Sequence, residues 1–245
     1  MTVIEPAVWD RFVESQDPGS YLQTSAWAAV KAVNGWSAHR LVGPPDAQHG
    51  PGAIGAQILV RRPRPMPWAF AYAPRGPVAA TWTHAAIEGF TAAARDGLPT
   101  AAGRVSHLRV DPEIEADGPF DPDGMLRRDL RGAGWRPAAA IQPNATRIID
   151  LRPDEASLWG DLRKKWRQYV NKARSGGVTV VDADGDRLPE FYRIYRETAD
   201  RAGFLIRTEA AYQDVWNACA NSSRALPAGA KALDRKSTRL NSSHG

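Results

Sequence analysis

Six cationic side chains are concentrated in one short stretch of the sequence, residues 158–177. The stretch contains a single acid, Asp161, and its cations are Arg163, Lys164, Lys165, Arg167, Lys172 and Arg174. Its apolar residues lie three and four positions apart, which is typical of one face of a helix. Gly176 and Gly177 can end that helix. A cationic face flanked by aromatic residues favours an anionic ligand, such as a phosphate group or an RNA backbone. A helix face that only contacts solvent is the alternative interpretation.

Three residues outside this stretch could also bind or position a substrate. Lys31 belongs to a predicted helix whose Trp27, Val30 and Val33 are expected to face the core, which places Lys31 near the opposite side. Arg75 lies at the tip of a rigid turn, APRGP. Asp111 follows a predicted strand and precedes a proline. Each has a structural alternative: a solvated lysine, an arginine that braces its own turn, and an Asp-Pro turn.

Several common catalytic and metal-binding patterns are absent from the sequence. It contains no G-x-S-x-G elbow, no Walker loop and no G-x-G-x-x-G after a predicted strand. The histidines have no ligand spacing, and there is no pair of cysteines to complete a site. We therefore expect neither a nucleophilic serine nor a bound metal.

The elements that must position these residues alternate between strands and helices. Helices are predicted at residues 6–16, 25–35, 82–96, 122–132, 158–177, 188–202 and 209–221. Strands are predicted at residues 36–42, 53–62, 68–72, 104–110, 146–151 and 178–182. This order predicts an α/β fold. The natural division falls near residues 142–144 and gives two domains, 1–144 and 145–233.

Composition and the two ends of the chain limit the class of protein further. The 245 residues carry a formal charge of +5 and one cysteine, Cys219, which favours a reducing compartment. The first residues do not resemble a signal peptide, so we expect a cytoplasmic protein. Residues 234–244, DRKSTRLNSSH, match the translation of a sequencing adapter, and we interpret 234–245 as a non-native tail. The second domain is then expected to be incomplete.

Five motifs occur in a characteristic order: YLQTSAWAAVKAVNGW, YAPRGPV, LRVDPEI, IQPNATRIIDL and LWGDLRKKWRQYVNKARSGGVTV. Together they resemble the FemABX family of aminoacyl-tRNA-dependent peptidoglycan transferases, over about residues 9–216. RETADRAGF, followed by Arg207 and Tyr212, is similar to the family's second domain. The resemblance implies tandem domains of the GNAT acyltransferase fold, the second incomplete here.

The resemblance also implies a reaction and a set of site residues. An aminoacyl-tRNA would donate its amino acid to a free amine on the stem peptide of a UDP-MurNAc-pentapeptide or of lipid II. In such enzymes a lysine and an arginine hold the pyrophosphate of the acceptor. By position in the motifs these are Lys31 and Arg167, with Arg163 and Lys164 as neighbours and Tyr169 as a further contact. The resemblance implies no cofactor, since aminoacyl-tRNA is a co-substrate, and it implies peripheral association with the inner membrane face. As a fragment, the chain is expected to be inactive.

The predicted chemistry needs few catalytic groups. The donor ester is already activated, so an enzyme nucleophile is unnecessary. A lysine-type amine with a pKa of about 10.4 must lose a proton before it attacks. Asp111 is the candidate contact to this amine, and the identity of the general base stays open.

Two other classes of function stay open. A small-molecule GNAT acyltransferase would need an R/Q-x-x-G-x-G/A loop for acyl-CoA, which residues 1–233 lack. A non-catalytic RNA-binding module could use the basic helix. That helix's aromatic residues alternate with core positions, however, and are expected to be buried rather than available for base stacking.

Overall fold

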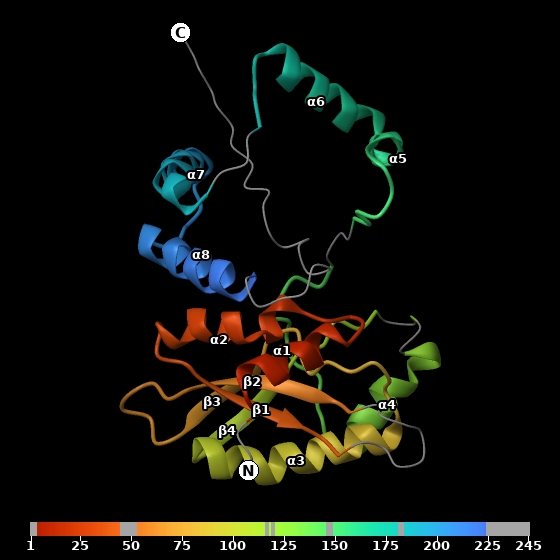
Figure 1. Ribbon diagram of the computed structural model, residues 1–245. Coiled ribbons are helices and arrows are strands. Elements are labelled where there is room, and N and C mark those ends of the chain that lie inside the picture. The colour runs from red at the N-terminus through yellow and green to blue at the C-terminus, as the bar shows by residue number, and fades with distance from the viewer. Residues whose placement is uncertain are drawn as a thin grey trace. The chain divides into compact units, whose positions relative to one another are not determined.

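The computed structural model describes residues 4–44, 53–115, 118, 121–145, 149–180 and 184–223 (Figure 1). The chain divides into two compact units, Met1–Asn144 and Ala145–Gly245, and each is described by itself. The predicted tail at residues 234–245 lies outside the described residues. Within the described ranges, no helix combines the length and apolar character that crossing a bilayer requires.

The first unit is built on a four-stranded sheet in the order β1-β2-β3-β4. Its strands are β1 (Ser37–Val42), β2 (Gly55–Arg61), β3 (Ala69–Ala73) and β4 (Val105–Val110). The first three strands pair antiparallel, whereas β4 pairs parallel to β3 after a crossover through helix α3 (His84–Ala102). The carboxyl ends of β3 and β4 therefore lie at the same edge of the sheet.

Helices cover both faces of this sheet (Figure 1). On one face α3 packs Ile87, Phe90 and Leu98 into a core whose sheet residues include Ile58 and Ala71. The opposite face carries α1 (Pro6–Glu14) and α2 (Ser25–Ala32). As the sequence predicts, α2 begins after Thr24, whose hydroxyl accepts a hydrogen bond from the Trp27 backbone N–H. Short helices η1 (Tyr21–Gln23) and η2 (Pro122–Gly124) and helix α4 (Met125–Gly132) complete the unit.

Helix α3 is longer than predicted, because it continues past Asp96 to Ala102. Gly97 is a signal for a helix end. The next residue, Leu98, is buried against the sheet, with only 3% of its surface exposed. Burial of that side chain outweighs the roughly 1 kcal/mol that a helical glycine costs.

The regular secondary structure in the described part of the second unit is entirely helical. The helices are α5 (Glu155–Asp161), α6 (Lys164–Ser175), η3 (Gly185–Arg187), α7 (Leu188–Ala202) and α8 (Glu209–Ser223). Asp154 caps α5 by accepting a hydrogen bond from the Ser157 backbone N–H at 2.8 Å. Helices α7 and α8 meet through aromatic contacts, such as the edge contact between Tyr195 and Tyr212 at 5.8 Å.

The prediction of one continuous basic helix over residues 158–177 is wrong. The stretch forms α5 and α6, and the chain is extended between them, with ψ of 132° at Leu162 and 144° at Arg163. The Arg167 guanidinium donates hydrogen bonds to the Gly160 carbonyl at 2.7 Å and the Trp159 carbonyl at 3.4 Å. A side chain of α6 thus binds the last turn of α5, where the Trp159 carbonyl also accepts a hydrogen bond from the Leu162 backbone N–H at 3.3 Å.

Two predicted strands are also absent from the described part of the second unit. Residues 149–151 of the first and 178–180 of the second have no strand structure, and their remaining residues lie outside the described ranges. A strand needs a hydrogen-bonded neighbour. The described residues of this unit provide none.

Candidate functional site

The candidate site lies where the parallel strands β3 and β4 end. In their register Ala73 is the partner of Val110, so the turn after β3 lies beside the residue that follows β4, which is Asp111. This turn contains Arg75, whose φ of 52° falls in the left-handed region. A non-glycine residue in that region needs support from its surroundings.

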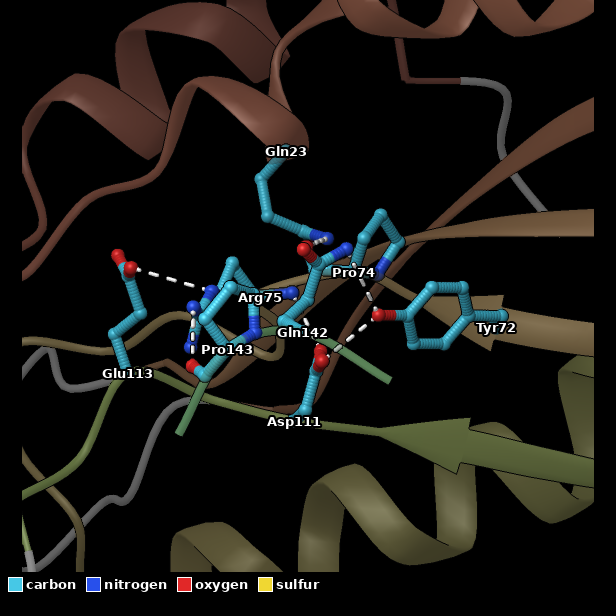
Figure 2. A network of polar contacts seen from close by, with 8 residues as sticks. All are labelled: Gln23, Tyr72, Pro74, Arg75, Asp111, Glu113, Gln142 and Pro143. Carbon is cyan, nitrogen blue, oxygen red and sulfur yellow. Dashed lines mark hydrogen bonds and ion pairs between the residues drawn. The ribbon is translucent and has the colours of Figure 1, made fainter. Parts of the chain in front are cut away.

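The Asp111 carboxylate supplies this support, and Figure 2 shows it between Tyr72 and Arg75. The Tyr72 hydroxyl donates to Oδ2 of Asp111 at 2.7 Å, and the Arg75 backbone N–H donates to Oδ1 at 2.6 Å. The Asp111 backbone N–H donates to the Gly76 carbonyl at 3.0 Å. Asp111 therefore fastens the turn to the end of the sheet, and each carboxylate oxygen keeps capacity for a second hydrogen bond.

The Arg75 guanidinium is held within the same network. Its Nη2 donates to the Pro143 carbonyl at 2.9 Å, and its Nε lies 3.4 Å from Oε1 of Glu113. Only 16% of the Arg75 side chain is exposed. The structure thus brings two predicted site residues, Arg75 and Asp111, into one network, with the arginine in the bracing arrangement that the sequence left open.

A buried glutamine supports the turn from the side of η1 (Figure 2). The Gln23 amide donates to the Pro74 carbonyl at 2.8 Å and accepts from the Gln57 backbone N–H at 2.7 Å. A Cβ at Gly76 would lie 2.6 Å from this amide. The amide cannot move away without losing buried hydrogen bonds, so the position requires glycine.

Tyr72, Gln23, Glu113 and Gln142 were not identified from the sequence as site residues. The Gln142 amide donates to the Tyr72 hydroxyl at 3.3 Å, which leaves that hydroxyl free to donate to Asp111. The available signal is that all four belong to motifs of the family resemblance: Gln23 to YLQTSAWAAVKAVNGW, Tyr72 to YAPRGPV, Glu113 to LRVDPEI and Gln142 to IQPNATRIIDL.

Burial raises the pKa of the Tyr72 hydroxyl to about 12, and its hydrogen bond to Asp111 adds to the increase. The hydroxyl therefore stays protonated and keeps donating to Asp111 throughout the physiological range.

This pKa predicts how stability depends on pH. The native pKa exceeds the ordinary value of 10, so the native state binds more protons than the unfolded chain between about pH 10 and pH 12. The contribution of the Tyr72 hydroxyl to the free energy of unfolding is therefore complete below pH 10 and is lost as the pH rises through about 12. Denaturant unfolding at about pH 9 and about pH 11 should show a larger loss of stability in the native chain than in Tyr72→Phe. Equal losses in the two proteins would contradict the assignment.

Lys31 lies on α2, and its ammonium group is 4.7 Å from the centre of the Trp27 ring. The prediction that Lys31 and Trp27 occupy opposite sides of the helix is wrong, because residues four positions apart share a face. Val30 is buried, as predicted, whereas Val33 is 66% exposed and does not face the core.

The other predicted binding residues lie at the start of α6 and along it. Arg163 precedes the helix, Lys164 is its first residue, and Arg167 binds the end of α5. Tyr169 is 50% exposed, and the Lys165 ammonium lies 5.6 Å from its ring centre. Trp166 is 59% exposed. The prediction that the aromatic residues of this helix are buried is therefore wrong for Trp166 and Tyr169, because the described residues leave half or more of the surface of each exposed.

No group of three or more histidine, cysteine, aspartate or glutamate side chains in the described part of the chain is arranged to hold a metal ion. The network at the sheet edge consists of carboxylate, phenol, amide and guanidinium groups. Such groups can bind and orient an amine or a carbonyl without a metal.

Comparison with known proteins identifies the family. The sequence model of the FemAB family matches residues 4–117 and 126–238. The chain belongs to the FemAB family. The match in two regions confirms the predicted resemblance and its tandem arrangement of domains.

Individual FemAB relatives agree with this assignment. The chain is 27% identical over 214 residues to lipid II:glycine glycyltransferase of Staphylococcus aureus, and the same values hold for that enzyme in strain USA300. The alignment covers 85% of this chain and 49% of the relative, so the chain spans about half the length of the curated relatives it matches. The crystal structure of FemX has a TM-score of 0.70 at 23% identity, covering 89% of this chain and 54% of FemX. This likeness confirms the predicted α/β fold class.

Proposed function

We propose that this chain forms part of an aminoacyltransferase that adds an amino acid to the stem-peptide amine of a peptidoglycan precursor. The observation that carries the proposal is the similarity over 85% of the chain to a lipid II:glycine glycyltransferase. The acceptor would be lipid II or a UDP-MurNAc-pentapeptide, and the donor would be an aminoacyl-tRNA. The enzyme would work in the cytoplasm, associating with the inner membrane face when the acceptor is lipid-linked.

The network around Asp111 suits the acceptor amine. Tyr72 and the Arg75 backbone N–H fix the carboxylate, and its remaining acceptor capacity can bind an ammonium group. The ammonium group first loses one proton to a base, and its nitrogen then forms an amide bond with the ester carbonyl carbon, releasing a second proton. The bond from that carbon to the ribose oxygen breaks, and the ribose oxygen takes up a proton. No cofactor is needed, because the ester supplies the driving force.

The cationic residues would bind the phosphates of the substrates. We propose that Lys31 and Arg167 contact the acceptor's pyrophosphate, with Arg163 and Lys164 beside Arg167. Tyr169 would pack against the substrate with its exposed ring. Arg75 would act mainly as a positioning residue, since its guanidinium is already bonded to Pro143 and close to Glu113.

Salt dependence of donor binding tests this function against its alternatives. The formal charge of the chain is only +5, so we expect few contacts to RNA phosphates. With about three contacts and a logarithmic slope of roughly 0.7 each, affinity for aminoacyl-tRNA should fall at least about tenfold between about 50 and 200 mM salt. Filter binding of labelled aminoacyl-tRNA measures this, with acyl-CoA as competitor. A response independent of salt, or displacement by acyl-CoA, would favour a small-molecule acyltransferase instead.

A further inference from the structure

A groove of about 750 Å³ lies along β4 in the first unit, and most of it has no part in the network around Asp111. It is lined by residues 107–112, by residues 134–141 and by three side chains of α4. This volume is typical of sites for small organic ligands.

The groove carries an excess of positive charge. Four arginines line it: Arg109, Arg127, Arg131 and Arg136. Asp111 is the one carboxylate among these lining residues, and it already accepts hydrogen bonds from Tyr72 and Arg75. Arg127 pairs with the buried Asp121 at 2.6 Å. In the described part of the chain, no carboxylate forms an ion pair with any of the other three arginines.

The segment that carries the groove arginines is anchored by packing of Trp135 against α3. Arg127 and Arg131 are four residues apart and therefore share a face of the helix, whereas Arg128 does not line the groove. Beyond α4, the Trp135 ring stacks on Phe90 at 6.4 Å, and its Nε1 donates to the Thr91 hydroxyl at 2.9 Å. This anchoring reduces the conformational entropy that ligand binding would cost.

The walls between the arginines are apolar, and a smaller cavity continues them. The apolar residues that line the groove include Leu108, Val110, Leu130, Ala138, Ala139 and Ala140. A neighbouring cavity of about 250 Å³ shares His107, Leu108, Gly134 and Trp135 with the groove and extends to Ala94 and Leu98. The two together offer cationic groups for an anion and apolar surface for a compact organic group.

We propose that this groove binds an organic phosphate, with the phosphate held by Arg131 and Arg136 and the organic part against the apolar wall. Arginine is well suited to this role because its guanidinium matches phosphate in a bidentate geometry. The proposal does not depend on aminoacyl transfer, and it concerns residues other than the proposed pyrophosphate contacts Lys31 and Arg167.

Calorimetric titration of the full chain with phenyl phosphate, inorganic phosphate and inorganic pyrophosphate tests this site. The variant Arg131→Gln/Arg136→Gln should weaken phenyl phosphate and pyrophosphate binding about tenfold or more, because it removes two charge-assisted contacts. The control Arg128→Gln/Arg152→Gln loses the same charge outside the groove and should stay within about twofold of the native affinity. Circular dichroism checks that both variants are folded.

The expected outcomes distinguish binding in the groove from non-specific attraction of phosphates to a cationic protein surface. Phenyl phosphate should bind more tightly than inorganic phosphate, since only the former reaches the apolar wall. Arg131→Lys/Arg136→Lys keeps the charge and should restore part of the affinity lost in the glutamine variant. Equal weakening in the groove and control variants, no advantage for phenyl phosphate, or no binding at millimolar concentrations would each overturn the proposal.

Discussion

Replacing Asp111 with asparagine should lower kcat/KM for the acceptor about a hundredfold or more, in the whole enzyme that contains this chain. The Asp111 carboxylate accepts hydrogen bonds from both the Tyr72 hydroxyl and the Arg75 backbone N–H, which fix its position in the network. Asparagine keeps the shape of the side chain but removes the negative charge that would bind and orient the acceptor amine. Steady-state rates of transfer at several acceptor concentrations measure the effect.

The matched control for this variant is Glu113→Gln. Glu113 lies 3.4 Å from the Arg75 guanidinium, in the same network, and its side chain is 35% exposed. The Glu113 side of the pair is partly screened by solvent, and Arg75 keeps its hydrogen bond to the Pro143 carbonyl, so loss of the pair should change the rate less than about fivefold. If both variants lose activity equally, or if Asp111→Asn retains the native rate, Asp111 serves only to hold the turn.

The second large effect is expected at the cationic residues. Lys31→Ala and Arg167→Ala should each weaken use of the acceptor about ten- to a hundredfold, since a charge-assisted contact contributes roughly 1.5–3 kcal/mol. The loss should appear mainly in KM, because these contacts bind phosphates away from the reacting amine. Arg167 also binds the end of α5, so its variant needs a check of helix content.

Two control variants carry the same change of charge. Lys172→Ala removes a cation from the last turn of α6 without touching a proposed contact. Arg61→Ala removes a cation that lies over a tryptophan ring, as Lys31 does, at 5.9 Å from Trp36. Both should leave KM within about twofold of the native value. Unchanged kinetics in Lys31→Ala and Arg167→Ala, or equal effects in the controls, would refute the assignment.

Local patterns in the sequence were sufficient to predict most elements of the first unit. Short strand-like runs bounded by loops rich in glycine and proline located β1 to β4, and Thr24 was correctly expected to cap α2. These signals act over a few residues, so a single sequence contains them. The break between α5 and α6 escaped prediction because the apolar spacing continues unchanged through Leu162 and Arg163.

The candidate site was harder to predict, because its contacts join residues far apart in the chain. Tyr72 and Asp111 are 39 positions apart and meet only because β4 pairs parallel to β3. Gln23 reaches the turn from 51 positions before Pro74. Sequence reasoning could name Arg75 and Asp111 as candidates, but their mutual geometry depends on strand order and register, which no local pattern specifies.

Product analysis tests the central claim most directly. The whole enzyme that contains this chain is incubated with labelled aminoacyl-tRNA and, in separate reactions, with UDP-MurNAc-pentapeptide or lipid II. Mass spectrometry of the stem peptide should show the addition of one aminoacyl residue at the side-chain amine, together with release of deacylated tRNA. An unmodified stem peptide with both acceptors, or acylation that requires acyl-CoA in place of aminoacyl-tRNA, would contradict the proposed function.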